Sequence, residues 1–123
     1  MFKKKIMAFG LVASVFAASV SASAGTISST SLTGTDASTS YYHLGGGDHV
    51  LKGTGTSGSG IAKAKKINRL FPDSTVAQID VTSPYSSTDS FSAVSSTNGA
   101  NQSYYIQWNG ASKSASANVE ISH

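Results

Sequence analysis

Two histidines and an aspartate flank a run of three glycines, and they are the best candidate cluster for metal-ligand chemistry in the sequence. His43 precedes the glycines at 45–47, and Asp48 and His49 follow them. Imidazole nitrogens and a carboxylate on a flexible loop are donor types that bind zinc or copper. Such sites usually need a third or fourth ligand, and His123 is the one further histidine. Exposed loop residues are therefore the favoured interpretation, and we predict no metal site and no cofactor.

A glycine pattern follows a few residues later. Residues 53–58 match G-x-G-x-x-G, and Asp73 lies twenty residues beyond Gly53. In dinucleotide-binding proteins such glycines let backbone amides approach a pyrophosphate. Here no βαβ pattern surrounds the match, and the abundance of glycine, serine and threonine makes chance matches common. The favoured interpretation is a mobile loop or a strand with small side chains.

Catalytic side chains are present without a catalytic arrangement. Serine, histidine and aspartate all occur, but no serine lies in a nucleophile-elbow sequence. Glycoside hydrolysis needs two carboxyl groups in one cleft, whereas Asp73, Asp80 and Asp89 are scattered through expected turns and strands. We therefore predict that the protein is not an enzyme and has no catalytic residues.

Aromatic pairs supply the stronger binding candidates. Neighbouring side chains in a strand point to opposite faces, so one member of each pair, Tyr41-Tyr42 and Tyr104-Tyr105, must lie on an outer face. Exposed Tyr and Trp often stack on sugars or contact protein partners. Core packing accounts well for Tyr104 and Trp108, which leaves Tyr105 and one of Tyr41 and Tyr42 as surface candidates.

Basic residues cluster in the middle of the chain. This cluster could dock on anionic cell-wall polymer or lipid headgroups, although a solvated face that balances dispersed acids is the favoured alternative. The aromatic and basic binding candidates together are Tyr41, Tyr42, Tyr105, Trp108, Lys63, Lys65, Lys66 and Arg69.

The first 24 residues have the three parts of a secretory signal peptide. Lysines occupy 3–5, an uncharged apolar run covers 6–20, and Ala22-Ser23-Ala24 forms the cleavage pattern. The apolar run is shorter than the roughly 20 residues that span a bilayer. Cleavage after Ala24 leaves six cationic and six acidic residues, so the formal charge of +3 disappears. We predict a secreted, extracellular protein with no stable membrane span after cleavage and no nucleic-acid partner.

The chain has no cysteine, so disulfides and thiolate metal sites are excluded. Serine and threonine number 31 within residues 25–123, a composition that suits β proteins with hydroxyl-rich outer faces. We predict an all-β fold, a small antiparallel β-sandwich or sheet. Residues 25–40 are expected to be a flexible Ser/Thr-rich lead-in, with at most an edge strand around Ile27, and residues 41–123 a single β-rich domain.

Alternating apolar residues locate the strands. Residues 104–108 and 111–122 both alternate, and Asn109-Gly110 between them is the preferred pair for a tight turn, so we predict a C-terminal hairpin over 102–122. Further strands are predicted at 75–82, at 90–94 and, interrupted by the glycines, at 41–52. Residues 60–71 fit either a strand or one short helix, because Ala64, Ile67 and Phe71 lie at helical spacing.

Several short segments of the sequence resemble segments of one known protein family. Tyr41-Tyr42-His43 with His49, the run ending at residues 62–65, and residues 103–108 are similar in layout to small secreted β-sandwich bacteriocins of the lactococcin type. The resemblance covers about half of residues 25–123 and implies interference with the envelope of related bacteria. The leading functional hypothesis is a non-catalytic binding or structural protein of the bacterial cell surface or extracellular matrix. Its partner would be a cell-wall polymer, another envelope component or another secreted protein.

Overall fold

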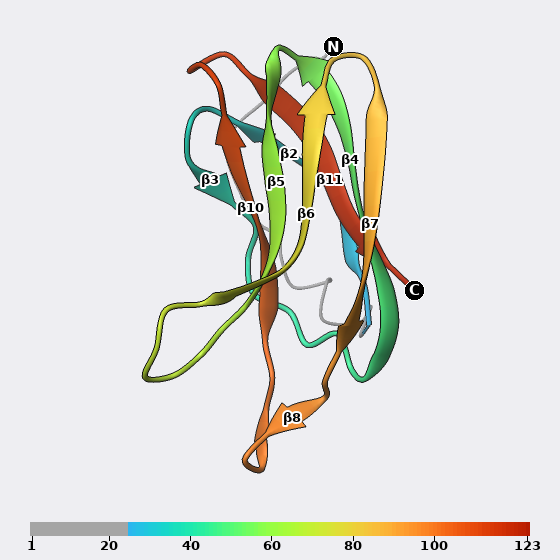
Figure 1. Ribbon diagram of the computed structural model, residues 1–123, viewed down its shortest axis with the longest axis vertical. Coiled ribbons are helices and arrows are strands. Elements are labelled where there is room, and N and C mark those ends of the chain that lie inside the picture. Colours follow the sequence, from blue (N-terminus) through green and yellow to red (C-terminus); the bar gives the residue numbers. More distant parts are fainter. Residues whose placement is uncertain (1–24) are drawn as a thin grey trace.

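The computed structural model describes residues 25–123, so the signal-peptide prediction lies outside the described residues. Two four-stranded antiparallel sheets pack against each other, and a two-stranded hairpin projects from one end (Figure 1). The strands are β2 (Ile27–Thr33), β3 (Ala37–Ser38), β4 (Gly47–Ser57), β5 (Ser59–Lys66), β6 (Ser74–Thr82), β7 (Ser86–Ala93), β8 (Ser96–Thr97), β9 (Ala100–Asn101), β10 (Tyr104–Gly110) and β11 (Ser116–Ser122). The predicted all-β sandwich is confirmed.

The chain changes sheet at most of its connections. The first sheet has the order β3-β10-β5-β6, the second has the order β2-β11-β4-β7, and β8 pairs with β9. Among the eight strands of these two sheets, β5 and β6 are the one pair of consecutive strands that share a sheet. Most strands therefore pair with partners that are distant in sequence.

The core lies between the sheets and follows the period-two alternation of the strands. Buried residues alternate with exposed or partly exposed ones along most of β6, β10 and β11. The predicted strand at 75–82 is confirmed by β6, with Ala77, Ile79 and Val81 inward. Strand β7 contains most of the predicted strand at 90–94, and Phe91 and Ala93 are buried as expected.

The predicted C-terminal hairpin is wrong. Strand β10 pairs with β3 and β5 in the first sheet, whereas β11 pairs with β2 and β4 in the second. The inward side chains of β10 and β11 therefore face each other across the core instead of lying side by side. Asn98-Gly99, the other Asn-Gly pair, forms the tight turn between β8 and β9, with φ angles of 52° and 84°.

Three other predictions are corrected or decided by the pairing. Residues 60–71 contain β5 and a loop instead of a helix, because β5 hydrogen-bonds to β10 and β6 along its length. The segment 25–40 belongs to the sandwich: β2 pairs with β11 and buries Ile27 and Leu32, so the domain begins before Tyr41. The strand predicted at 41–52 is divided between a single bridge at Tyr42 and β4.

The glycine pattern at 53–58 belongs to β4 and the turn that follows it. Gly53 and Gly55 face β6 and the turn after it, where the two sheets approach closely. A Cβ atom on Gly55 would lie 2.5 Å from the backbone nitrogen of Ser83 and 2.7 Å from its Cα. The glycines therefore serve the packing of the two sheets, which agrees with the interpretation as a strand with small side chains.

We expect Gly55→Ala to lower the free energy of unfolding by about 1–3 kcal/mol, because backbone atoms at Ser83 cannot rotate away from the added methyl group. Denaturant unfolding of the purified protein measures this. Gly46→Ala is the matched control, since its Cβ would lie in ordinary contact, 3.9 Å from the carbonyl oxygen of Ala93. Equal stability of the two variants would contradict the packing role of Gly55.

Candidate binding surface

The outward side chains of β10, β5 and β6 form a continuous polar surface, which we call the tyrosine–lysine face. Residues opposite each other in antiparallel strands share a face of the sheet. The strand register gives three rows across the face: Tyr105, Lys65 and Thr75; Gln107, Lys63 and Gln78; and Asn109, Ile61 and Asp80. The last row lies four positions along β10 from the first, a distance of about 13 Å.

One corner of this face holds two tyrosines and a carboxylate. The rings of Tyr41 and Tyr105 have centroids 5.3 Å apart and are tilted by 50°. The Tyr105 hydroxyl donates a hydrogen bond of 2.7 Å to Asp73 Oδ2. Tyr41 is 67% exposed, so its ring is open to a ligand. The Tyr105 side chain is contacted by the Tyr41 ring and by Asp73.

Burial raises the pKa of Tyr105 to about 12, and the hydrogen bond to Asp73 and the negative charge of that residue act in the same direction. The phenol is thus neutral and donating under ordinary conditions. Because Asp73 also accepts from the backbone N–H of Asn68 at 3.2 Å, this contact ties Tyr105 to the loop between β5 and β6.

Two lysines lie along the centre of the face. Lys65 donates from Nζ to Thr75 Oγ1 at 3.0 Å, and Lys63 lies between Gln107 and Gln78. Both side chains are partly exposed. Their ammonium groups are therefore available to an anionic ligand beside the tyrosine corner.

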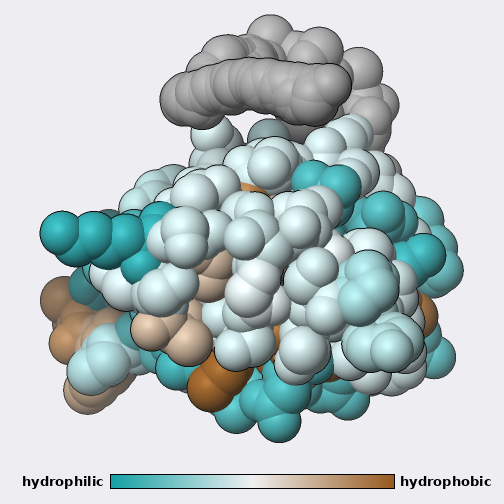
Figure 2. Space-filling model, turned by 90° about the horizontal axis from the view of Figure 1, so that it is seen from above, coloured by the Kyte–Doolittle hydropathy of each residue, from teal (hydrophilic) through white to brown (hydrophobic). Residues whose placement is uncertain are grey.

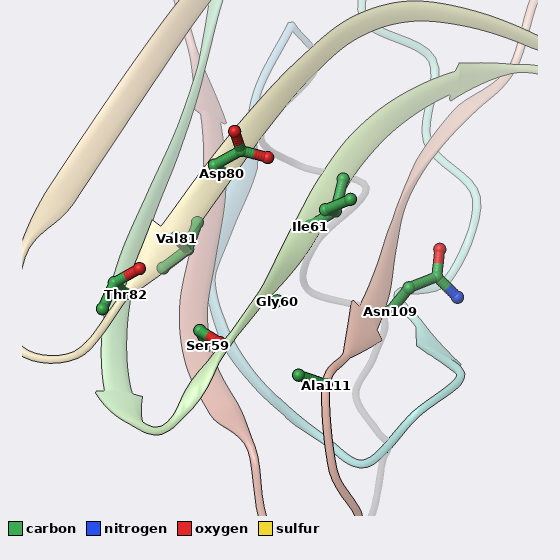
Figure 3. A pocket seen from close by; sticks show the side chains of 8 residues that line it. All are labelled: Ser59, Gly60, Ile61, Asp80, Val81, Thr82, Asn109 and Ala111. Carbon is green, nitrogen blue, oxygen red and sulfur yellow. The ribbon is translucent and has the colours of Figure 1, made fainter.

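A shallow hollow of about 340 Å³ lies at the opposite end of the face. Asp80, Ile61 and Asn109 project there from three adjacent strands (Figure 3). Gly60 has no side chain, and the Trp108 ring fills the space where its Cβ would be. A carboxylate, an amide and an aliphatic surface together suit hydrogen bonding and van der Waals contact with a small polar group.

The structure separates the predicted binding residues into three groups. Tyr41, Tyr105 and Lys65 lie together, and Lys63 follows along the same face. Lys66 closes the base of the β5–β6 loop and Arg69 lies exposed within that loop, away from the rows of the face. Tyr42 packs partly against the core and pairs with Tyr104 through its backbone.

Trp108 was expected among the binding residues, and this prediction is wrong. Its side chain is fully buried, and its indole N–H donates to the Ala115 carbonyl oxygen at 3.3 Å. It is inward because β10 alternates and Tyr104 and Ile106 lie on the same buried side. Trp108 therefore stabilises the core and is inaccessible to a ligand.

His43, Asp48 and His49 do not converge. His49 is fully buried instead of exposed: Nδ1 lies 3.0 Å from the Gly47 oxygen and Nε2 3.1 Å from the Leu44 oxygen. Exposed His43 contacts the Gln102 carbonyl oxygen, and Asp48 accepts from Ser92. Residues 25–123 contain no group of three or more His, Cys, Asp or Glu side chains placed to hold a metal ion.

Two features of this region were missed by sequence reasoning. Asp73 was treated as a turn residue, yet it binds Tyr105 from 32 residues away. Phe71 was assigned to the apolar side of a possible helix, and Leu70 was given no role, yet both side chains lie exposed in the β5–β6 loop. Pro72 directly after Phe71 was the available signal that this stretch leaves regular structure.

No family model, curated protein or solved structure matches this chain. Among residues 25–123, no helix has the length and apolar character needed to cross a membrane.

The Tyr105 contact predicts a stability change at high pH. Its folded pKa of about 12 exceeds the ordinary value of 10.0, so the unfolded chain loses this proton first. The neutral Tyr105 phenol therefore contributes fully to the stability of the folded protein below pH 10, and this contribution is lost as pH rises toward 12. We expect the unfolding free energy to fall over that range, and to fall less steeply in Tyr105→Phe. Chemical denaturation at a series of pH values measures this.

Two comparisons isolate the cause. Tyr85→Phe, at a residue 71% exposed in the β6–β7 turn, should retain the wild-type pH dependence. Asp73→Asn should lower the pKa of Tyr105 in a near-ultraviolet titration, because it removes a nearby negative charge. An unchanged slope in Tyr105→Phe would exclude Tyr105 as the titrating group.

Proposed function

We propose that this is a secreted, non-catalytic binding protein that acts at the bacterial cell surface or in the extracellular matrix. The observation that carries the proposal is the tyrosine–lysine face, where an exposed Tyr41 ring stands against Tyr105 beside Lys65. The ligand class that fits is a cell-wall polymer with sugar rings and anionic groups.

Each part of that ligand has a partner on the face. An aromatic ring presents an apolar surface that packs on the flat side of a sugar ring. Lys63 and Lys65 supply positive charge for phosphate or carboxylate groups, and Gln107, Asn109 and Asp80 supply hydrogen-bonding groups along the same surface. A polymer lying across the strands of this flat face would meet all three chemistries.

The face is held in place before a ligand arrives. Its three strands pair continuously with one another, and Tyr105 is hydrogen-bonded to Asp73. Side chains that are already ordered lose less conformational entropy on binding. This organisation favours a binding role for the outward residues over the alternative, in which they only form a solvated surface.

Lipid-free bacterial cell walls test the proposal in a sedimentation assay. We expect Tyr41→Ala to weaken retention by about two- to tenfold, through loss of an aromatic contact. We expect Lys63→Gln with Lys65→Gln to weaken it by about three- to tenfold at low salt, and the difference to shrink as salt screens the charges.

Lys52→Gln is the matched charge control, because Lys52 is an exposed lysine of β4 in the second sheet, opposite Glu120. It should leave retention unchanged. If the wild-type protein is not retained by walls, or if all variants are retained equally, the tyrosine–lysine face is not the binding surface.

A second candidate function is that of a secreted antibacterial protein of the bacteriocin type, acting on the envelope of related bacteria. The observation in its favour is a pair of bulky apolar side chains held in solvent beside a basic residue: Leu70 is 88% exposed, Phe71 is 74% exposed, and Arg69 precedes them. Apolar side chains beside a cationic one can insert into the interface of another cell's membrane.

Addition of the purified protein to cultures of related strains measures this activity. The second candidate predicts growth arrest at micromolar protein and loss of the effect in Leu70→Ser with Phe71→Ser. Normal growth of every strain tested would rule out the antibacterial function while leaving wall binding intact.

A further inference from the structure

The loop between β5 and β6, residues 67–73, presents the two most exposed large apolar side chains of the described chain. Leu70 is 88% exposed and Phe71 is 74% exposed. The loop projects to the left of the sandwich in Figure 1. Seen from above in Figure 2, brown atoms project on that same side, whereas most of the surface is pale or teal. The apolar tip is thus a local feature of an otherwise hydroxyl-rich surface.

Hydrogen bonds hold the loop in a defined shape. Asn68 Nδ2 donates to the Pro72 carbonyl oxygen at 3.0 Å and to Ser74 Oγ at 2.7 Å, which closes the loop across its own neck. Asp73 joins the loop to Tyr105, as described above. These bonds lie at the base, and residues 69–71 form the tip.

A buried glutamine anchors the other side of the neck. Gln102 is 5% exposed, and its Nε2 donates to the Ile67 carbonyl oxygen at 2.8 Å. Its Oε1 accepts from Thr97 of β8 at 2.6 Å, and the Ile67 N–H donates to the Ser103 oxygen at 3.1 Å. The chain therefore uses a buried polar side chain to hold a loop whose tip places leucine and phenylalanine in water.

Positive charge lies at this tip and behind it. Arg69 is exposed beside Leu70, and Lys66 lies at the base of the loop, where it pairs with Ser74. The acidic group of the loop, Asp73, is engaged with Tyr105 and Asn68. An apolar tip followed by a cationic collar is complementary to a bilayer whose headgroups are anionic.

We propose that the β5–β6 loop docks on anionic lipid membranes, with Leu70 and Phe71 entering the headgroup–acyl boundary and Lys66 and Arg69 meeting the lipid headgroups. The tip is convex and narrow, a shape that penetrates a fluid interface and offers little area to a flat protein surface. This site is separate from the tyrosine–lysine face, so it extends the proposed function without resting on it.

Vesicle co-sedimentation tests the proposal with the purified protein and two lipid compositions. We expect binding to vesicles of phosphatidylcholine with phosphatidylglycerol, and much weaker binding to phosphatidylcholine alone. Leu70→Ser with Phe71→Ser should reduce the partition coefficient by about tenfold or more, through loss of apolar burial. Lys66→Gln with Arg69→Gln should reduce it by a similar factor at low salt and have less effect at high salt.

Matched controls separate docking from damage to the fold. Tyr85→Ser removes a side chain that is 71% exposed in the turn at the other end of β6, and it should bind as the wild type does. The tip variant should unfold at the same denaturant concentration as the wild type, because Leu70 and Phe71 contribute little to the core.

The absence of native cysteine permits a direct probe of insertion. The emission maximum of an environment-sensitive fluorophore attached to Phe71→Cys should shift to shorter wavelength when anionic vesicles are added. The emission of the same fluorophore attached to Tyr85→Cys should not shift.

Three results would overturn the proposal: no binding to anionic vesicles, equal binding of the wild type and the tip variant, or a tip variant that changes the oligomeric state in the absence of lipid. The last result would assign the tip to contacts between copies of the chain. Retention on lipid-free walls is measured in parallel, so failure on vesicles alone removes the lipid proposal, and failure on walls alone removes the proposed function.

Discussion

The close approach of two sheets built largely from small side chains is the constraint on which this fold depends. Without cysteine, stability must come from packing and hydrogen bonds. The core contains several buried alanines, and Trp108 lies where a side chain on Gly60 would otherwise be. Its indole N–H reaches the Ala115 oxygen, beside the point where the chain passes from the first sheet to the second. Larger side chains at the glycine positions would force the sheets apart.

The inward packing also fixes what faces outward. Because Tyr104, Ile106 and Trp108 enter the core, Tyr105, Gln107 and Asn109 must lie on the opposite side of β10. Lysines at alternate positions of β5 are presented beside them by the same rule. The chemistry of the outer surface is thus positioned by the alternation that builds the core, and it is as rigid as the sheet that carries it.

The β5–β6 loop differs from the rest of the surface, where most side chains are small or polar. Its base is tied to β10 through Asp73 and to β8 through Gln102, so the tip is held in place by structure on both sides. Apolar side chains in a disordered loop could turn inward or collapse together; here the neck keeps Leu70 and Phe71 directed to solvent. A flat polar face and a convex apolar tip lie next to each other, connected by one hydrogen bond from Tyr105. In the two proposals, the face contacts a cell-wall polymer and the tip contacts a lipid membrane.

The sequence by itself determined the all-β class, the position of β6, the inward residues of β7 and the alternation of β10 and β11. These follow from local periodicity, which is the same whichever strand lies alongside. It could not decide that β10 and β11 belong to opposite sheets, because an alternating strand buries one face equally well in either arrangement. It also offered two Asn-Gly pairs, of which only 98–99 forms a hairpin turn. The burial of Trp108 and His49, the Tyr105–Asp73 contact and the exposed tip at 70–71 were decided by tertiary structure, since each depends on residues brought together from distant parts of the chain.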